Sequence, residues 1–102
     1  MTDDSLKTLT AAMHAFVASK GWYAPDSARP QTLRNLAVSL VLEASEVLEH
    51  FQWSDDVADR EELASELADV FLYLVQLASL GEVDLAQAVY AKLDKNYKRT
   101  WE

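Results

Sequence analysis

The residues that usually interrupt helices are concentrated in one short segment of this chain. Both prolines and one of the two glycines fall within residues 21–30, GWYAPDSARP. Outside this segment, apolar residues recur at steps of three and four, which is the spacing of one face of an α-helix. We therefore predict an all-α fold whose one substantial irregular connection follows the first helix.

The apolar periodicity predicts four helices within a single domain that spans residues 1–102. The predicted ranges are residues 5–19, 32–51, 57–80 and 84–98. Asp55 or Asp56 would cap the third helix and Asp84 the fourth, since aspartate accepts hydrogen bonds from the first free backbone N–H groups. Gly81 would end the third helix. The expected architecture is a small four-helix bundle.

Composition limits the class of protein. Half of the 102 residues are apolar, which is more than a short chain can bury alone, so we expect oligomerisation to complete the bundle. The net charge of -8 argues against nucleic acid or an anionic membrane surface as partner. No cysteine is present, which excludes disulfides and thiolate zinc sites. We find no apolar run of about 20 residues and no signal peptide, and so predict a cytoplasmic protein that does not enter a membrane.

Two pairs of carboxylates lie within apolar helical stretches. Glu43 and Glu46 occur in LEASEVLEHFQW, and Glu66 and Asp69 occur in ASELADVFLYL. The spacing of three residues puts both members of a pair on one side of a helix. Carboxylates in apolar surroundings are costly unless they are paired or bind a metal, and Arg60 is the only lysine or arginine between Leu36 and Leu80.

Four converging carboxylates would suit a hard cation, Mg²⁺ or Mn²⁺. Periodicity alone leaves their convergence open, and a solvated acidic face is the alternative. A di-iron bundle requires Glu-x-x-His pairs, and neither His14 nor His50 has a carboxylate three residues before it. A zinc site would prefer nitrogen or sulfur ligands.

The ordered set of motifs resembles a known family. Glu43-x-x-Glu46, followed after 19 residues by Glu66-x-x-Asp69, is similar to the MazG-like nucleoside triphosphate pyrophosphohydrolases. It also resembles the related dCTP pyrophosphatases and dimeric dUTPases. The segment Phe51-Gln52-Trp53 resembles the end of the family's second helix. Lys92-Leu93-Asp94-Lys95-Asn96 resembles its final Lys-x-x-x-Asn segment.

The resemblance implies Mg²⁺-dependent hydrolysis of (deoxy)nucleoside triphosphates to monophosphate and pyrophosphate. It favours dCTP-like substrates and a house-cleaning role that removes non-canonical or excess nucleotides. Glu43, Glu46, Glu66 and Asp69 would be the catalytic metal ligands, with Mn²⁺ as a substitute for Mg²⁺. One of the glutamates would accept the proton of the attacking water, and the sequence leaves open which one.

Six further residues are expected to bind the substrate. They are Trp22 and Trp53 by stacking on the base, Tyr73 at the sugar, Asn35 or Asn96 at the base edge, and Lys92 at the phosphates. The alternative for each is ordinary packing or a solvated helix face. The resemblance also implies a homodimer or homotetramer. The rival hypothesis from another class is a non-catalytic helical interaction module with the same fold.

Overall fold

The computed structural model describes residues 3–101, and all regular structure in that range is helical. Its helices are α1 (Leu6–Ser19), α2 (Leu33–Glu49), α3 (Arg60–Leu80) and α4 (Leu85–Lys98). These bounds confirm the predicted all-α fold, with each helix within a few residues of its predicted range.

Each helix begins at a polar cap residue. The side chains of Ser5, Thr32, Asp59 and Asp84 each accept a hydrogen bond from the backbone N–H three residues later. The predicted cap at Asp84 is therefore confirmed. The predicted cap at Asp55 or Asp56 is wrong, because residues 50–58 form turns and bends and α3 begins only at Arg60.

Two glycines mark helix ends as predicted. Gly21 follows α1 with a φ of 74°, a left-handed conformation that favours glycine because a Cβ would clash with the backbone there. Gly81 is the C-cap of α3, and an added Cβ would lie only 2.9 Å from the carbonyl oxygen of Leu77. Gly21 is thus the first residue of the irregular segment after α1, and Gly81 begins the turn between α3 and α4.

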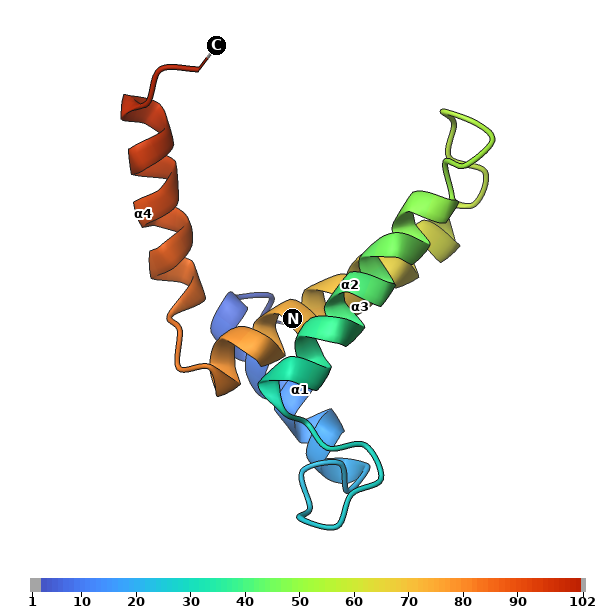
Figure 1. Ribbon diagram of the computed structural model, residues 1–102, viewed down its shortest axis with the longest axis vertical. Coiled ribbons are helices and arrows are strands. Elements are labelled where there is room, and N and C mark those ends of the chain that lie inside the picture. The colour runs from blue at the N-terminus through green and yellow to red at the C-terminus, as the bar shows by residue number, and fades with distance from the viewer. Residues whose placement is uncertain (1–2, 102) are drawn as a thin grey trace.

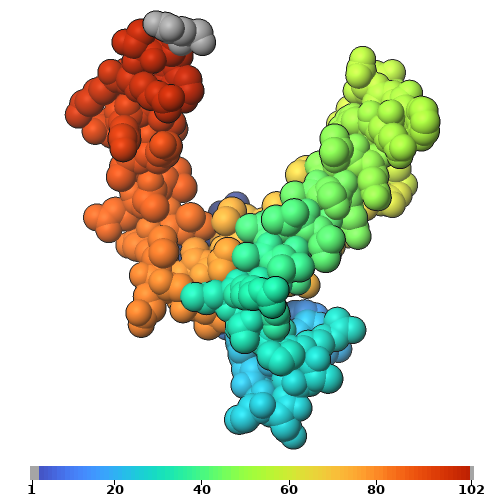
Figure 2. All heavy atoms as spheres, in the orientation of Figure 1, coloured from blue at the N-terminus to red at the C-terminus, as the bar shows by residue number. Residues whose placement is uncertain are grey.

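The helices form an open arrangement (Figure 1). Helices α2 and α3 run antiparallel along one another, α1 packs against α3, and α4 stands apart from the α2–α3 hairpin. The radius of gyration of 16.2 Å exceeds the roughly 13 Å of a compact domain of this length. The space-filling view shows the same two arms, with α4 meeting the rest of the molecule only near its first residues (Figure 2).

The buried core is small and lies where α1 meets α3. Met13, Val17 and Val75 are almost fully buried there, and Leu85 at the start of α4 packs against them. Phe16 and Leu74 occupy apolar positions of the helical pattern, but half of Phe16 and about two fifths of Leu74 are exposed.

Large apolar side chains remain exposed on three helices. They are Leu33, Val38, Val41, Leu42 and Leu48 of α2, Leu67, Leu72, Leu74 and Leu80 of α3, and Val89, Tyr90, Leu93 and Tyr97 of α4. By length and composition α3 is also apolar enough to cross a membrane, contrary to the expectation from its sequence. A mostly buried core helix passes the same test, but only 11% of the apolar stretch of α3 is buried, although α3 packs along α2.

Candidate active site

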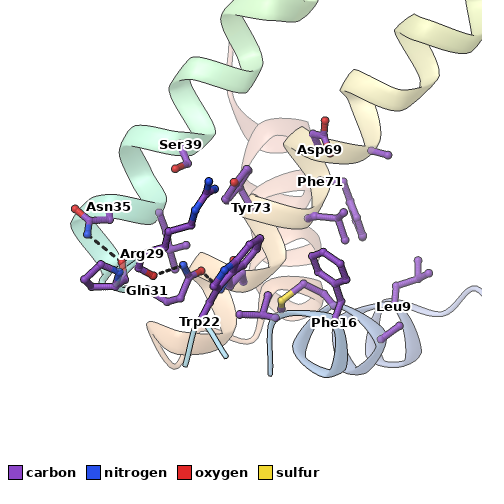
Figure 3. Close-up of a pocket in the computed structure, with 18 of the residues that line it drawn as sticks. Leu9, Phe16, Trp22, Arg29, Gln31, Asn35, Ser39, Asp69, Phe71 and Tyr73 are labelled. Carbon is purple, nitrogen blue, oxygen red and sulfur yellow. Dashed lines mark hydrogen bonds between the residues drawn. The ribbon is translucent and has the colours of Figure 1, made fainter. Parts of the chain in front are cut away.

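A cavity of about 770 Å³ lies between α1, the irregular segment and the facing sides of α2 and α3. This volume is within the usual range for small-molecule sites. Figure 3 shows its aromatic walls, Phe16, Trp22, Phe71 and Tyr73, together with the polar side chains of Arg29, Gln31 and Asn35. Asp69 is also part of its wall.

Trp22 is held between an aromatic ring and a cation. The ring of Phe16 meets it edge-on with centroids 5.8 Å apart, and the guanidinium carbon of Arg29 lies 5.3 Å from its ring centroid. Such contacts orient the indole ring at modest energetic gain. The result is an aromatic side chain with a positive charge over its ring, which suits a planar ligand that carries negative charge.

Asp69 connects the cavity to a group of carboxylates on α2 and α3. Burial raises the pKa of Glu43, and the negative charges of Glu46, Asp69 and Glu66 raise it further. The Oε2 atom of Glu43 is buried and has no hydrogen-bond partner among the described residues. The two carboxylate pairs therefore influence one another across the α2–α3 interface.

A histidine contributes to the same region. His50, at the C-terminal end of α2, has its Nε2 atom 2.6 Å from Oε2 of Glu66, and both side chains are largely buried. Glu62 lies one turn before Glu66, and ligand atoms of the three side chains lie within 4.8 Å of one another. Metal ligands are commonly oriented by such a hydrogen bond from a second residue.

The donor set fits a divalent cation. A buried carboxylate oxygen without a partner is expensive, and nothing basic other than His50 pairs with these carboxylates in residues 3–101. Oxygen-rich sites favour Mg²⁺ or Mn²⁺, whereas an imidazole would also tolerate other transition metals. The metal dependence that the resemblance implies is therefore compatible with this chain's own residues.

The structure brings together only some of the predicted substrate-binding residues. Trp22, Asn35 and Tyr73 line the cavity. Trp53 lies beyond the far end of α2, where 90% of its surface is exposed, and Lys92 and Asn96 lie on the separate helix α4. Within one copy of the chain, these last three residues are remote from the cavity.

Sequence reasoning missed four polar residues of this region, namely Arg29, Gln31, His50 and Gln76. The helical spacing could have indicated two of them, because residues seven apart lie on the same face of a helix. His50 follows Glu43 by seven residues and Gln76 follows Asp69 by seven. Arg29 and Gln31 lie in the irregular segment, where periodicity gives no direction for a side chain.

Comparison with known proteins supports this description. Residues 31–101 match the MazG nucleotide pyrophosphohydrolase domain family. The structure superposes on the crystal structure of a pyrophosphatase from Archaeoglobus fulgidus with a TM-score of 0.78 and 31% sequence identity, covering the whole of this chain and 97% of the archaeal one.

Curated relatives share part of the chain. Mouse dCTP pyrophosphatase 1 is 44% identical over 75 residues, which are 65% of this chain and 44% of the mouse protein. Human dCTP pyrophosphatase 1 is 43% identical over the same share of each chain. The chain thus spans less than half of the length of these relatives. Since the family match covers well over half of the sequence, the chain belongs to the MazG nucleotide pyrophosphohydrolase domain family.

Proposed function

We propose that this protein hydrolyses (deoxy)nucleoside triphosphates to the monophosphate and pyrophosphate in a Mg²⁺-dependent reaction. The observation that carries the proposal is that Asp69 belongs both to the cavity wall and to the carboxylate group around Glu43. A site for a flat aromatic ligand is thereby continuous with a site for a divalent cation. Nucleoside triphosphates combine these two chemical features in one molecule.

The roles follow from the position of each side chain. Trp22 offers the stacking surface for the base, Tyr73 lies between the base region and Asp69 on α3, and Asn35 is at the cavity edge. Glu43, Glu46, Glu66 and Asp69 hold the cation, which when bound neutralises the phosphate oxygens and favours ionisation of a water molecule. A glutamate of this group accepts the proton of the water that attacks the α-phosphorus, and pyrophosphate leaves.

The favoured substrates are dCTP-like nucleotides, and the physiological role is house-cleaning of excess or non-canonical nucleotides. The names of the mouse and human relatives support this assignment. So does the position of Trp22 beside the cavity, because stacking on an aromatic ring is worth about 1–3 kcal/mol per base. Mn²⁺ is expected to replace Mg²⁺, since both accept carboxylate ligands.

Self-association into a homodimer or homotetramer completes the site. The exposed apolar stripe of α4 and that of the α2–α3 hairpin are complementary in chemistry, and Oδ1 of Asn96 is buried without a partner among the residues described. A second copy would cover these surfaces and bring Trp53, Lys92 and Asn96 toward a neighbouring cavity.

We place the protein in the cytoplasm, without nucleic-acid or membrane partners. The net charge of -8 opposes binding to polyanions. Helix α3 carries Glu66, Asp69 and Gln76 within its apolar stretch, and such groups are costly in hydrocarbon. Its apolar faces are better explained by contact between subunits.

The proposal is tested by incubating the purified protein with Mg²⁺ and each deoxynucleoside triphosphate, then separating the products. Monophosphate and pyrophosphate are expected, with no products in EDTA. Glu43→Gln is expected to abolish turnover, whereas Glu49→Gln, an exposed glutamate of the same helix, keeps it. A folded protein that hydrolyses none of these nucleotides with Mg²⁺ or Mn²⁺ would favour the interaction module instead.

A further inference from the structure

The end of the cavity opposite Asp69 contains two glutamine side chains in direct contact. Gln76 of α3 is only 3% exposed, and its Nε2 donates to Oε1 of Gln31 at 2.8 Å. The Nε2 atom of Gln31 in turn donates to the backbone carbonyl oxygen of Arg29 at 2.7 Å. Both glutamines line the cavity, so their remaining polar atoms are available to a ligand.

The orientation of both amides follows from the backbone carbonyl of Arg29. A carbonyl oxygen only accepts hydrogen bonds, so Gln31 must present its NH₂ group to Arg29 and its oxygen to Gln76. That oxygen requires a donor, so Gln76 must present its NH₂ group in return. The usual ambiguity between the oxygen and nitrogen of an amide is thereby removed for this pair.

A further chain of hydrogen bonds supports the same orientation. The second hydrogen on Nε2 of Gln76 goes to the hydroxyl oxygen of Tyr23, at 3.2 Å. The Tyr23 hydroxyl can then donate to Nδ1 of His14, 2.6 Å away, and His14 can donate from Nε2 to the Ser79 hydroxyl at 2.7 Å. Burial raises the pKa of the Tyr23 hydroxyl, against a smaller opposite effect of the bond from Gln76, so this hydroxyl keeps its hydrogen.

These hydrogen bonds leave the Gln31–Gln76 pair with one acceptor and one donor for a ligand. Both hydrogens on the Gln76 nitrogen are engaged, so Gln76 can offer a ligand only its Oε1 acceptor. Gln31 has one N–H left after its bond to Arg29. An acceptor and a donor on two hydrogen-bonded side chains match the pairing edge of cytosine, which has an amino group beside a ring-nitrogen acceptor. Uracil and thymine present a carbonyl oxygen beside an N–H, the reverse polarity.

We propose that the Gln31–Gln76 pair selects nucleotides whose base carries an exocyclic amino group beside a ring-nitrogen acceptor, with cytosine as the fitting pyrimidine. Adenine has the same edge, whereas uracil, thymine and hypoxanthine have the reversed one. The inference rests on the proposed function, since it assumes that the base of a nucleotide enters this cavity.

The position of the pair along α3 is consistent with this role. Gln76 and Asp69 are seven residues apart on one face, which corresponds to about 10.5 Å along the helix axis. A nucleotide lying along α3 would therefore reach the glutamines with its base and the carboxylate group with its phosphates. Trp22 and Gln31 line the same cavity (Figure 3), so the indole ring would stack on the base while the glutamines contact its edge.

The test compares substrates that differ only by an amino or a keto group, dCTP with dUTP and dATP with dITP. We expect wild-type kcat/KM to be at least about tenfold higher for the amino member of each pair, the value of one well-made hydrogen bond. Gln76→Met, which keeps the side-chain length but removes the amide, should bring both ratios near one. A wild-type ratio near one, or one in favour of the keto member, would overturn the inference.

A second variant and a control keep the test decisive. Gln76 is buried and its replacement can affect folding, so Gln31→Met in the irregular segment is assayed in parallel and should lower the same ratios. Gln87→Met on α4 should leave them unchanged. Unchanged ratios in folded Gln31→Met and Gln76→Met proteins would also overturn the inference.

Binding measurements separate this inference from the proposed catalytic function. Calorimetric titration of metal-free protein with dCMP and dUMP reports base selection without turnover. Preference for dCMP, lost in Gln31→Met, would support the glutamine pair even if no triphosphate were hydrolysed. Hydrolysis of triphosphates with equal binding of the two monophosphates would support the catalytic function and contradict the role of the pair.

Discussion

Glu43 has the least favourable environment of the carboxylates in the site. Burial is the first cause of its raised pKa, and the neighbouring charges of Glu46, Asp69 and Glu66 add to it. Its unpartnered Oε2 atom indicates the same mismatch in the absence of a cation. A carboxylate that is costly in the folded state and lies in a group of carboxylates next to a cavity is typical of functional sites.

This environment predicts a pH dependence for the metal-free protein. Because the folded-state pKa of Glu43 lies above its ordinary value of 4.5, the folded state binds this proton more tightly than the unfolded state. Its contribution to stability is therefore lost as pH rises from about 4.5 through the raised pKa. Glu43→Gln should unfold at higher urea concentration than wild type at neutral pH in EDTA. Equal stability of the two proteins, or a similar gain in Glu49→Gln, would contradict this account.

His50 is expected to orient Glu66 through the hydrogen bond of 2.6 Å. Loss of a residue that positions a metal ligand typically costs about tenfold or more in metal affinity. His50→Leu should therefore raise the Mg²⁺ concentration for half-maximal activity and weaken Mn²⁺ binding in calorimetry. His50→Gln retains a hydrogen-bond donor and should recover part of this loss. Unchanged binding of Mn²⁺ by His50→Leu would show that the hydrogen bond has no such role.

At the residue scale, the sequence predicted what depends on spacing within one helix. The two carboxylate pairs could be placed on helix faces because their members are three residues apart. The contacts of His50 with Glu66 and of Gln31 with Gln76 join different elements. Their formation depends on how the elements pack, which no single periodic pattern contains.

At the scale of elements, the predicted first residue of α3 differs from the one in the structure. Asp55, Asp56 and Asp59 are all suitable N-caps by residue type. The structure selects Asp59, whose Oδ1 accepts from the backbone N–H of Glu62 at 3.1 Å. The helix ends at Gly21 and Gly81 were predictable because each is an isolated glycine next to a long periodic stretch.

The contribution of each candidate cap residue to the free energy of unfolding can be measured. Asp59→Ala removes the side-chain bond to the first turn of α3 and should lower the free energy of unfolding by about 1 kcal/mol. Asp55→Ala should change it by less than about 0.5 kcal/mol, as expected for an exposed loop position. Both values come from urea unfolding at one fixed protein concentration. A larger loss for Asp55→Ala than for Asp59→Ala would place the start of α3 earlier than the structure does.

At the scale of the whole molecule, the excess of apolar residues over core volume is the main feature. The sequence suggested this excess from composition alone, and the structure gives its location on α2, α3 and the separate α4. Four apolar positions of α4 follow helical spacing, including Tyr90 and Leu93, so they form one stripe. A second copy of the chain is the proposed cover for this stripe.

Self-association predicts a specific mutational effect. Leu93→Glu places a charge in the stripe and should shift the molar mass in light scattering from that of a dimer or tetramer toward that of the 11.4 kDa chain. Ala88→Glu adds the same charge on the opposite side of α4 and should leave the assembly intact. A wild-type protein that is monomeric at micromolar concentration would contradict the proposed completion of the site.

The central claim is tested most directly by following the reaction of dCTP with Mg²⁺ in ¹⁸O-labelled water. The expected products are dCMP and pyrophosphate, with the label in the phosphate of dCMP because water attacks the α-phosphorus. Release of dCDP and phosphate, label in pyrophosphate, or no reaction from folded protein would contradict it.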